Sequence, residues 1–86
     1  MRLKCVYKAD GPGPSEQIVS ITTSDKAEQI VLSKRKVAGG SIEVGDPLAE
    51  HNGMYLVELP RETASGRWRV WVPHSELIEA SMMAAE

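Results

Sequence analysis

Residues 53–77 read G-M-Y-L-V-E-L-P-R-E-T-A-S-G-R-W-R-V-W-V-P-H-S-E-L, and this stretch decides the fold. Around Tyr55 and again around Val70, apolar residues recur at every second position. A period of two is the pattern of a β-strand with one packed face. Pro60 cannot donate to a strand ladder, so the first strand ends there, and the polar residues up to Gly66 form a connection. The stretch therefore predicts a β-hairpin, around which the other strands are arranged.

The same alternation places the two tryptophans on opposite sides of the second strand. Trp68 shares its side with Val70 and is expected in the core, whereas Trp71 shares its side with Arg69 and Arg67. An indole flanked by guanidinium groups on a wet face is typical of protein-binding hot spots. The alternative is that an arginine stem or a C-terminal helix covers Trp71.

The beginning of the chain predicts a strand followed by a loop. Residues 2–9 alternate, with Leu3, Cys5 and Tyr7 on one face and basic residues on the other. This pattern indicates a half-buried strand whose basic residues suit a sheet edge. The Gly- and Pro-rich residues 10–15 break regular structure, which predicts a loop.

A tetrapeptide repeat suggests the next two strands. The sequence E-Q-I-V occurs at residues 16–19 and again at residues 28–31, a spacing that suits neighbouring strands of a meander. Alternatively, Asp25 caps a short helix over residues 26–36. We favour strands, because the second segment is rich in β-branched residues and the basic residues after it continue no apolar helical face.

The remaining segments supply a strand, a tight turn and a terminal helix. Residues 41–47 present alternating apolar side chains, and Asn52-Gly53 is a strong signal for a two-residue hairpin turn. The Ala-, Glu- and Met-rich residues 74–86 predict a short C-terminal helix with Ser75 as its N-cap. Its docking side is expected at Leu77, Ile78, Met82 and Met83.

Length and composition bound the class of protein. Eighty-six residues, 42% of them hydrophobic, predict a single domain over residues 1–86 with one small core. The net charge of −2 gives no strong field for phosphates or anionic lipids. A single cysteine, no apolar run long enough to cross a bilayer, and a charged N-terminus unlike a secretory signal together predict a cytoplasmic protein without a membrane partner.

Residues 42–77 resemble the second half of an SH3-type small barrel. The segments that carry the resemblance are I-E-V-G-D, N-G-M-Y-L-V-E-L and S-G-R-W-R-V-W-V-P-H-S-E-L, which is similar to the G-Y-V-P-S-N-Y-V ending of that family. The resemblance implies a mainly β, antiparallel SH3-like barrel or roll of five or six strands, with a single 3₁₀ turn after Pro73. Glu76 stands where the family carries a groove tyrosine, and the groove tryptophan would fall on Tyr55 or Leu56. The resemblance therefore implies the barrel and not the binding of proline-rich peptides.

These observations favour a non-catalytic interaction module that binds a protein partner or a second copy of itself. The expected binding residues are Trp71, Arg69, Arg67, Pro73 and Leu56. Cys5 alternates with apolar neighbours and is expected as a small buried residue. His51 and His74 belong to no metal-ligand spacing, and no nucleophile-elbow, P-loop or zinc-protease motif occurs. We therefore expect no enzyme activity, metal, cofactor or small-molecule substrate.

The alternative function is nucleic-acid binding by an accessory protein. Lys34, Arg35 and Lys36, with Arg67 and Arg69, would supply the basic patch. The negative net charge and the absence of a set of stacking aromatics weigh against this alternative.

Overall fold

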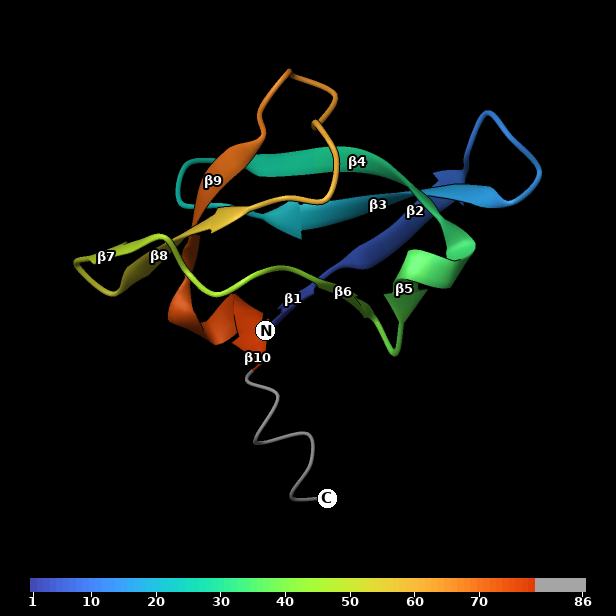
Figure 1. Ribbon diagram of the computed structural model, residues 1–86. Coiled ribbons are helices and arrows are strands. Elements are labelled where there is room, and N and C mark those ends of the chain that lie inside the picture. Colours follow the sequence, from blue (N-terminus) through green and yellow to red (C-terminus); the bar gives the residue numbers. More distant parts are fainter. Residues whose placement is uncertain (79–86) are drawn as a thin grey trace.

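The computed structural model describes residues 1–78, which form ten short strands and two 3₁₀ turns (Figure 1). The elements in order are β1 (Arg2–Lys4), β2 (Val6–Asp10), β3 (Glu16–Thr22), β4 (Ala27–Ser33), η1 (Lys34–Lys36), β5 (Val37–Ala38), β6 (Ser41–Glu43), β7 (Ala49–His51), β8 (Met54–Glu58), β9 (Arg69–Pro73), η2 (His74–Glu76) and β10 (Leu77–Ile78). The prediction of a mainly β, antiparallel protein is confirmed.

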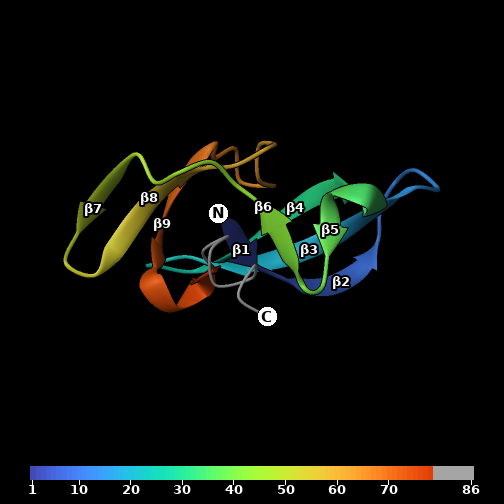
Figure 2. The same ribbon diagram turned by 60° about the horizontal axis from the view of Figure 1, so that its bottom comes forward.

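The strands form three antiparallel sheets. One has the order β10-β1-β6-β5, and the other two are the meanders β2-β3-β4 and β7-β8-β9. Figure 2 shows β7–β9 toward one end of the molecule and β2–β4 toward the other, with β1 between them. Within residues 1–78 the sheets do not close into a barrel. The number of strands is larger than the predicted five or six, because the chain passes from one sheet to another at short interruptions such as Cys5.

The four-stranded sheet is built symmetrically about the pair β1–β6. Leu3 of β1 lies opposite Ile42 of β6. On its other side Leu3 pairs with Leu77 of β10, and Ile42 in the same way pairs with Val37 of β5. Matching hydrogen bonds follow at both ends of the pair: the Cys5 amide donates to the Gly40 carbonyl and the Val44 amide to the Met1 carbonyl, each at 2.9 Å. The sheet therefore has an approximate two-fold axis through its centre.

This axis relates the two halves of the chain. Each half contains a short central strand, a three-stranded meander, a 3₁₀ turn and a closing strand. The pairing Val19–Ile30 in the first meander corresponds to Val57–Val70 in the second. The twelve buried apolar residues then fall into corresponding pairs: Leu3 and Ile42, Cys5 and Val44, Val19 and Val57, Ile21 and Leu59, Ile30 and Val70, Leu32 and Val72. The core is one cluster to which both halves contribute equally.

Two tight turns have positive φ at both central residues, and the first of them is the turn that the sequence predicts. Asn52 and Gly53, which join β7 to β8, have φ of 50° and 77°. Gly39 and Gly40, which join β5 to β6, have φ of 59° and 74°. Positive φ at both central positions is the requirement of a type I′ hairpin turn, which Asn and Gly meet at least cost.

The two E-Q-I-V segments lie on β3 and β4, which pair with each other along their whole length. Strands over these residues are confirmed, and the alternative of a helix over residues 26–36 is wrong. Ile30 and Leu32 are buried while Gln29 is exposed, so burial follows the period of a strand. Only residues 34–36 are helical, as one 3₁₀ turn.

Two expectations about side-chain placement need correction. Tyr7 is 57% exposed, not packed, because the strand is interrupted at Cys5 and the continuation β2 becomes the outer strand of a different sheet. The predicted C-terminal helix is replaced within the described residues by η2 and β10, because Leu77 pairs with Leu3 and packs against the core. The single 3₁₀ turn expected after Pro73 is present as η2. The predicted docking residues Met82 and Met83 lie outside the described residues.

In the part of the chain described, no helix has the length and apolar character needed to span a membrane.

The central pair gives a direct test of the shared core. Ile42 is fully buried, so Ile42→Ala should lower the free energy of unfolding by about 2–5 kcal/mol, the usual cost of such a cavity. Leu48 is 53% exposed, and Leu48→Ala should change the free energy of unfolding by less than about 0.5 kcal/mol. Urea unfolding followed by tryptophan fluorescence measures both variants. Equal effects of the two substitutions would contradict the placement of Ile42 at the centre of the core.

Candidate interaction face

The outer side of the hairpin β8–β9 brings together most of the predicted binding residues. The strand register places Leu56 opposite Trp71, with Met54 opposite Pro73 on one side. Alternate residues such as Val57 point to the other side and are buried. Leu56 of β8 is therefore a neighbour of Trp71 and Pro73 of β9 on one face, as predicted.

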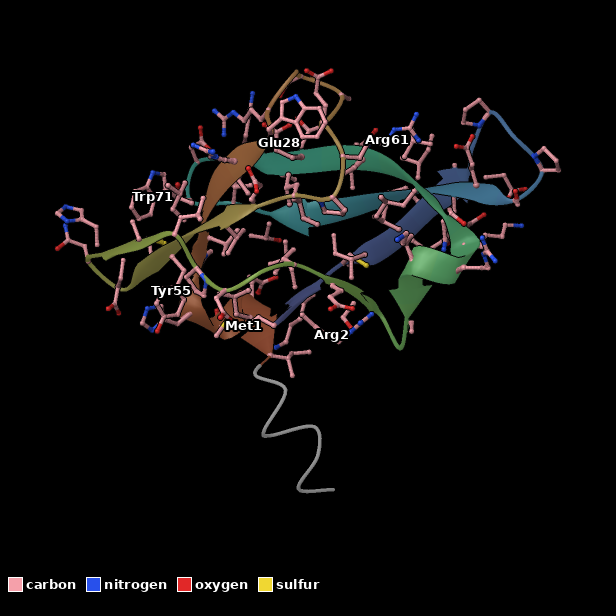
Figure 3. All side chains as sticks on the ribbon, viewed as in Figure 1. Met1, Arg2, Glu28, Tyr55, Arg61 and Trp71 are labelled. Atoms are coloured by element: carbon pink, nitrogen blue, oxygen red, sulfur yellow. The ribbon has the colours of Figure 1, made fainter. Side chains whose placement is uncertain are left out.

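Met54, Leu56, Trp71 and Pro73, here named the Trp71 face, are all half-buried. The adjoining strand β7 extends the face with exposed residues, because Ala49 pairs with Leu56. Figure 3 shows Trp71 beside β8 and β9, at the edge of the molecule.

An ion pair ends the Trp71 face on one side. Arg69 lies opposite Glu58 in the strand register, and its Nε is 3.3 Å from Glu58 Oε2. Both side chains are exposed, so the pair contributes little to stability and keeps charges of both signs beside the apolar residues. Arg69 is therefore where the sequence predicts it, but its charge is compensated.

The inner side of the same hairpin fixes the turn η2. The Tyr55 ring stacks on His74, with ring centroids 3.9 Å apart and an interplanar angle of 12°. His74 Nε2 lies 3.1 Å from Glu50 Oε2 of β7. These contacts tie the turn after Pro73 to the sheet, and they show that Tyr55 faces inward while Leu56 faces outward.

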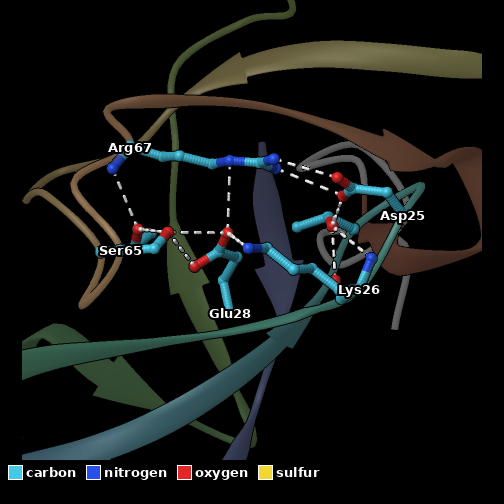
Figure 4. A network of polar contacts seen from close by, with 7 residues as sticks. Asp25, Lys26, Glu28, Ser65 and Arg67 are labelled. Atoms are coloured by element: carbon cyan, nitrogen blue, oxygen red, sulfur yellow. Dashed lines mark hydrogen bonds and ion pairs between the residues drawn. The ribbon is translucent and has the colours of Figure 1, made fainter.

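Arg67 does not belong to the Trp71 face, contrary to the prediction. Its guanidinium donates to both carboxylate oxygens of Asp25, at 3.2 and 2.9 Å, and its Nε lies 3.3 Å from Glu28 Oε2 (Figure 4). Arg67 precedes β9, so strand alternation does not fix its direction. The two acidic residues come from the β3–β4 turn and from β4, which the sequence alone does not place beside Arg67.

Glu28 is the centre of this network because it is only 3% exposed. Ser65 donates a 2.8 Å hydrogen bond to its carboxylate, and Lys26 Nζ lies 3.8 Å away. A buried carboxylate without such partners is strongly destabilising. The network therefore fastens the β8–β9 loop, at the top of Figure 1, to strand β4.

The Arg67 hydrogen bonds change the titration of the acidic partner. They hold the pKa of the Asp25 carboxyl well below its usual range, and a hydrogen bond from the Thr23 hydroxyl acts in the same direction. The Asp25 carboxylate in turn raises the pKa of Arg67. Asp25 and Arg67 therefore form an ion pair that joins the β3–β4 turn to the β8–β9 loop, here named the Asp25–Arg67 clamp. Within this pair the two opposite charges compensate each other.

Trp68 is exposed, and its predicted place in the core is wrong. Its side chain is 54% exposed, although its carbonyl still accepts a 2.8 Å hydrogen bond from the Leu59 amide. The chain bends at Trp68 before β9 begins at Arg69, and alternation does not extend through the bend. Thr63 of the preceding loop is buried at this end of the core. An exposed indole at this position was not predicted, because the period of two over residues 68–72 suggests one regular strand.

The remaining basic candidates lie elsewhere. The exposed turn η1 is formed by Lys34, Arg35 and Lys36. By contrast, Arg67 lies before β9 and Arg69 is the first residue of that strand. Cys5 is buried as predicted, and burial raises the pKa of its thiol. Among residues 1–78, no three His, Cys, Asp or Glu side chains gather as metal ligands.

Comparison of the chain with protein-family models, with curated proteins and with solved structures gives no match.

The Asp25–Arg67 clamp predicts a pH dependence with a definite sign. Because the folded-state pKa of Asp25 is lowered, the clamp stabilises the fold above the ordinary carboxyl pKa of about 4 and is lost as the pH falls below it. Urea unfolding of the wild type between about pH 5 and about pH 2 should therefore show a steeper loss of stability than unfolding of Asp25→Asn. Asp46→Asn, which removes a carboxylate with no ion pair among residues 1–78, should keep the wild-type slope. Parallel curves for wild type and Asp25→Asn would contradict the clamp.

Proposed function

We propose that the protein is a non-catalytic interaction module that binds a protein partner, or a second copy of itself, through the Trp71 face. The observation that carries the proposal is the cross-strand pair Leu56–Trp71, which is half-exposed on the outer side of a regular hairpin. Both residues lie on paired strands, so little backbone entropy is lost when a partner covers them. Buried tryptophan is among the strongest contributors to binding energy in protein interfaces.

The surroundings of the face also suit a protein partner. Met54 and Pro73 continue the apolar surface beyond the central pair, and Arg69 with Glu58 forms a polar rim. An apolar centre with a polar rim is the usual anatomy of a protein interface. Because the rim carries one charge of each sign, a two-fold arrangement of two copies can place Arg69 of one opposite Glu58 of the other.

The SH3-type resemblance of residues 42–77 remains a proposal. The turn η2 after Pro73 and the pairing of β10 with β1 support it, and the sheets that do not close among the described residues weigh against the complete barrel.

Nucleic-acid binding is the weaker candidate. Arg67 and Arg69 are both held in ion pairs, which leaves Lys34, Arg35 and Lys36 as the contributors to a basic surface. A binding event that depends on these residues should weaken steeply with salt, whereas binding to the Trp71 face should respond little.

The two tryptophans provide a matched pair of variants. Trp71→Ala should abolish self-association in analytical ultracentrifugation, or the capture of specific proteins in a pull-down read by mass spectrometry. Trp68→Ala removes an equally large ring that lies outside the face, and should retain the wild-type behaviour. Leu56→Lys, which places a charge on the face without touching the core, should reproduce the effect of Trp71→Ala.

Thermal unfolding of all three variants separates loss of binding from loss of fold. If Trp71→Ala and Leu56→Lys keep every partner and the wild-type oligomeric state while folded, the Trp71 face is not the binding surface.

A further inference from the structure

A second surface, remote from the Trp71 face, gathers cations from two separate parts of the sequence. A hollow of about 500 Å³ is lined by Arg2, Arg35, Lys36, Ala38, Glu43 and Pro60, here named the cationic hollow. Its basic residues come from β1 and from η1, which are separated by more than thirty positions in the chain. Figure 3 shows Arg2 beside β6, well away from Trp71.

Within the described part of the chain, the cations of the hollow differ from the other arginines in making no ion pair. Arg61, Arg67 and Arg69 each make an ion pair. Among residues 1–78, neither Arg2 nor Arg35 makes one, and the same holds for Lys36. Within the described residues, no carboxylate therefore forms an ion pair with these three cations.

Arg2 is fixed in position by a buried serine. Its Nε donates to Ser41 Oγ at 2.7 Å and its Nη2 donates to the Ser41 carbonyl at 2.9 Å. Ser41 is only 3% exposed, and its hydroxyl donates in turn to the Ala38 carbonyl at 3.0 Å. The guanidinium is thereby held against the β5–β6 hairpin, while its Nη1 has no acceptor among the described residues. A guanidinium held in this way loses little side-chain entropy when it binds an anion.

The turn η1 presents the other two cations from a hydrogen-bonded backbone. The Arg35 amide donates to Ser33 Oγ at 3.3 Å, and the Val37 amide closes the turn on the Lys34 carbonyl. Arg35 and Lys36 line the hollow, whereas Lys34, on the same turn, does not. The turn therefore directs two of its three positive charges to one place.

The charge of the walls matches a phosphate group. Three cations and the single carboxylate of Glu43 leave the hollow at +2, although the whole chain carries −2. A phosphate monoester carries about −1.5 to −2 at neutral pH and offers three acceptor oxygens. Arginine is the side chain best suited to donate to such a group, with lysine as a point charge.

We propose that the cationic hollow binds a phosphate group, carried either by a small phosphorylated molecule or by a nucleic-acid backbone. This site is independent of the Trp71 face, and a ligand could occupy it while a protein partner is bound.

The experiment is a titration of the full chain with inorganic phosphate at constant ionic strength, followed by ¹⁵N nuclear magnetic resonance. Saturable shifts are expected at the Arg2 Nε–H and at the amides of η1 and β5. Arg35→Gln and Lys36→Gln should each weaken binding about fivefold, as expected for one lost charge-assisted contact. Lys34→Gln makes the same change of charge on the same turn and should keep the affinity within about twofold. Non-saturable shifts, or an equal loss in Lys34→Gln and Lys36→Gln, would show a diffuse charge effect and overturn the site.

Competition identifies the source of the phosphate. A nucleoside monophosphate that displaces phosphate, with Lys34→Gln unaffected, supports a small-molecule ligand. A single-stranded oligonucleotide that displaces phosphate more strongly, with a steep salt dependence, supports a nucleic-acid backbone. Failure of both to displace phosphate would contradict a site for phosphate esters.

Discussion

The antiparallel pair β1–β6 is the constraint on which the rest of the structure depends. Leu3 and Ile42 face each other at its centre, both with no exposed surface, and each is flanked by the closing strand of the other half. Each half of the chain therefore begins and ends in the central sheet, and its meander extends from that sheet. Neither half has a complete core alone, because the twelve buried apolar residues form one cluster. A chain of this length gains stability by closing one core from two similar halves, since small domains bury a limited fraction of their surface.

The same arrangement determines which surfaces remain for function. In each meander, buried residues such as Val19 and Val57 alternate with half-buried residues of the outer side, such as Leu56 and Trp71. The two halves use corresponding elements differently. After the second meander, the turn η2 is tied inward by the stacking of His74 on Tyr55, and the outer side of that meander carries Trp71. After the first meander, the turn η1 is exposed and carries Arg35 and Lys36 to the cationic hollow. Duplication of the architecture thus supplies one apolar surface and one basic surface.

Local signals in the sequence predicted much of the fold. They could not predict which segments far apart in the sequence lie side by side. The Asn52-Gly53 turn and the outward direction of Leu56 follow from two or three neighbouring residues, so they could be read directly. The prediction that Trp68 is buried was wrong because the chain bends at this residue, which ends the alternation. Tryptophan is not a residue type that indicates a bend. The two-fold relation could not be detected in the sequence, because Leu, Ile and Val replace one another at corresponding core positions. Such replacements keep the positions buried but leave the two halves with little sequence identity. The cationic hollow was missed because its residues meet only through the pairing of β1 with β6.

Native-state hydrogen exchange at increasing denaturant tests the central claim most directly, because it reports the stability of each meander separately. If β1 and β6 join two halves into one core, the slowest amides of β3–β4 and those of β8–β9 should converge on a single free energy equal to that of global unfolding. If one meander loses its protection in a separate opening of lower free energy while the other keeps full protection, the halves are independent and the account is wrong.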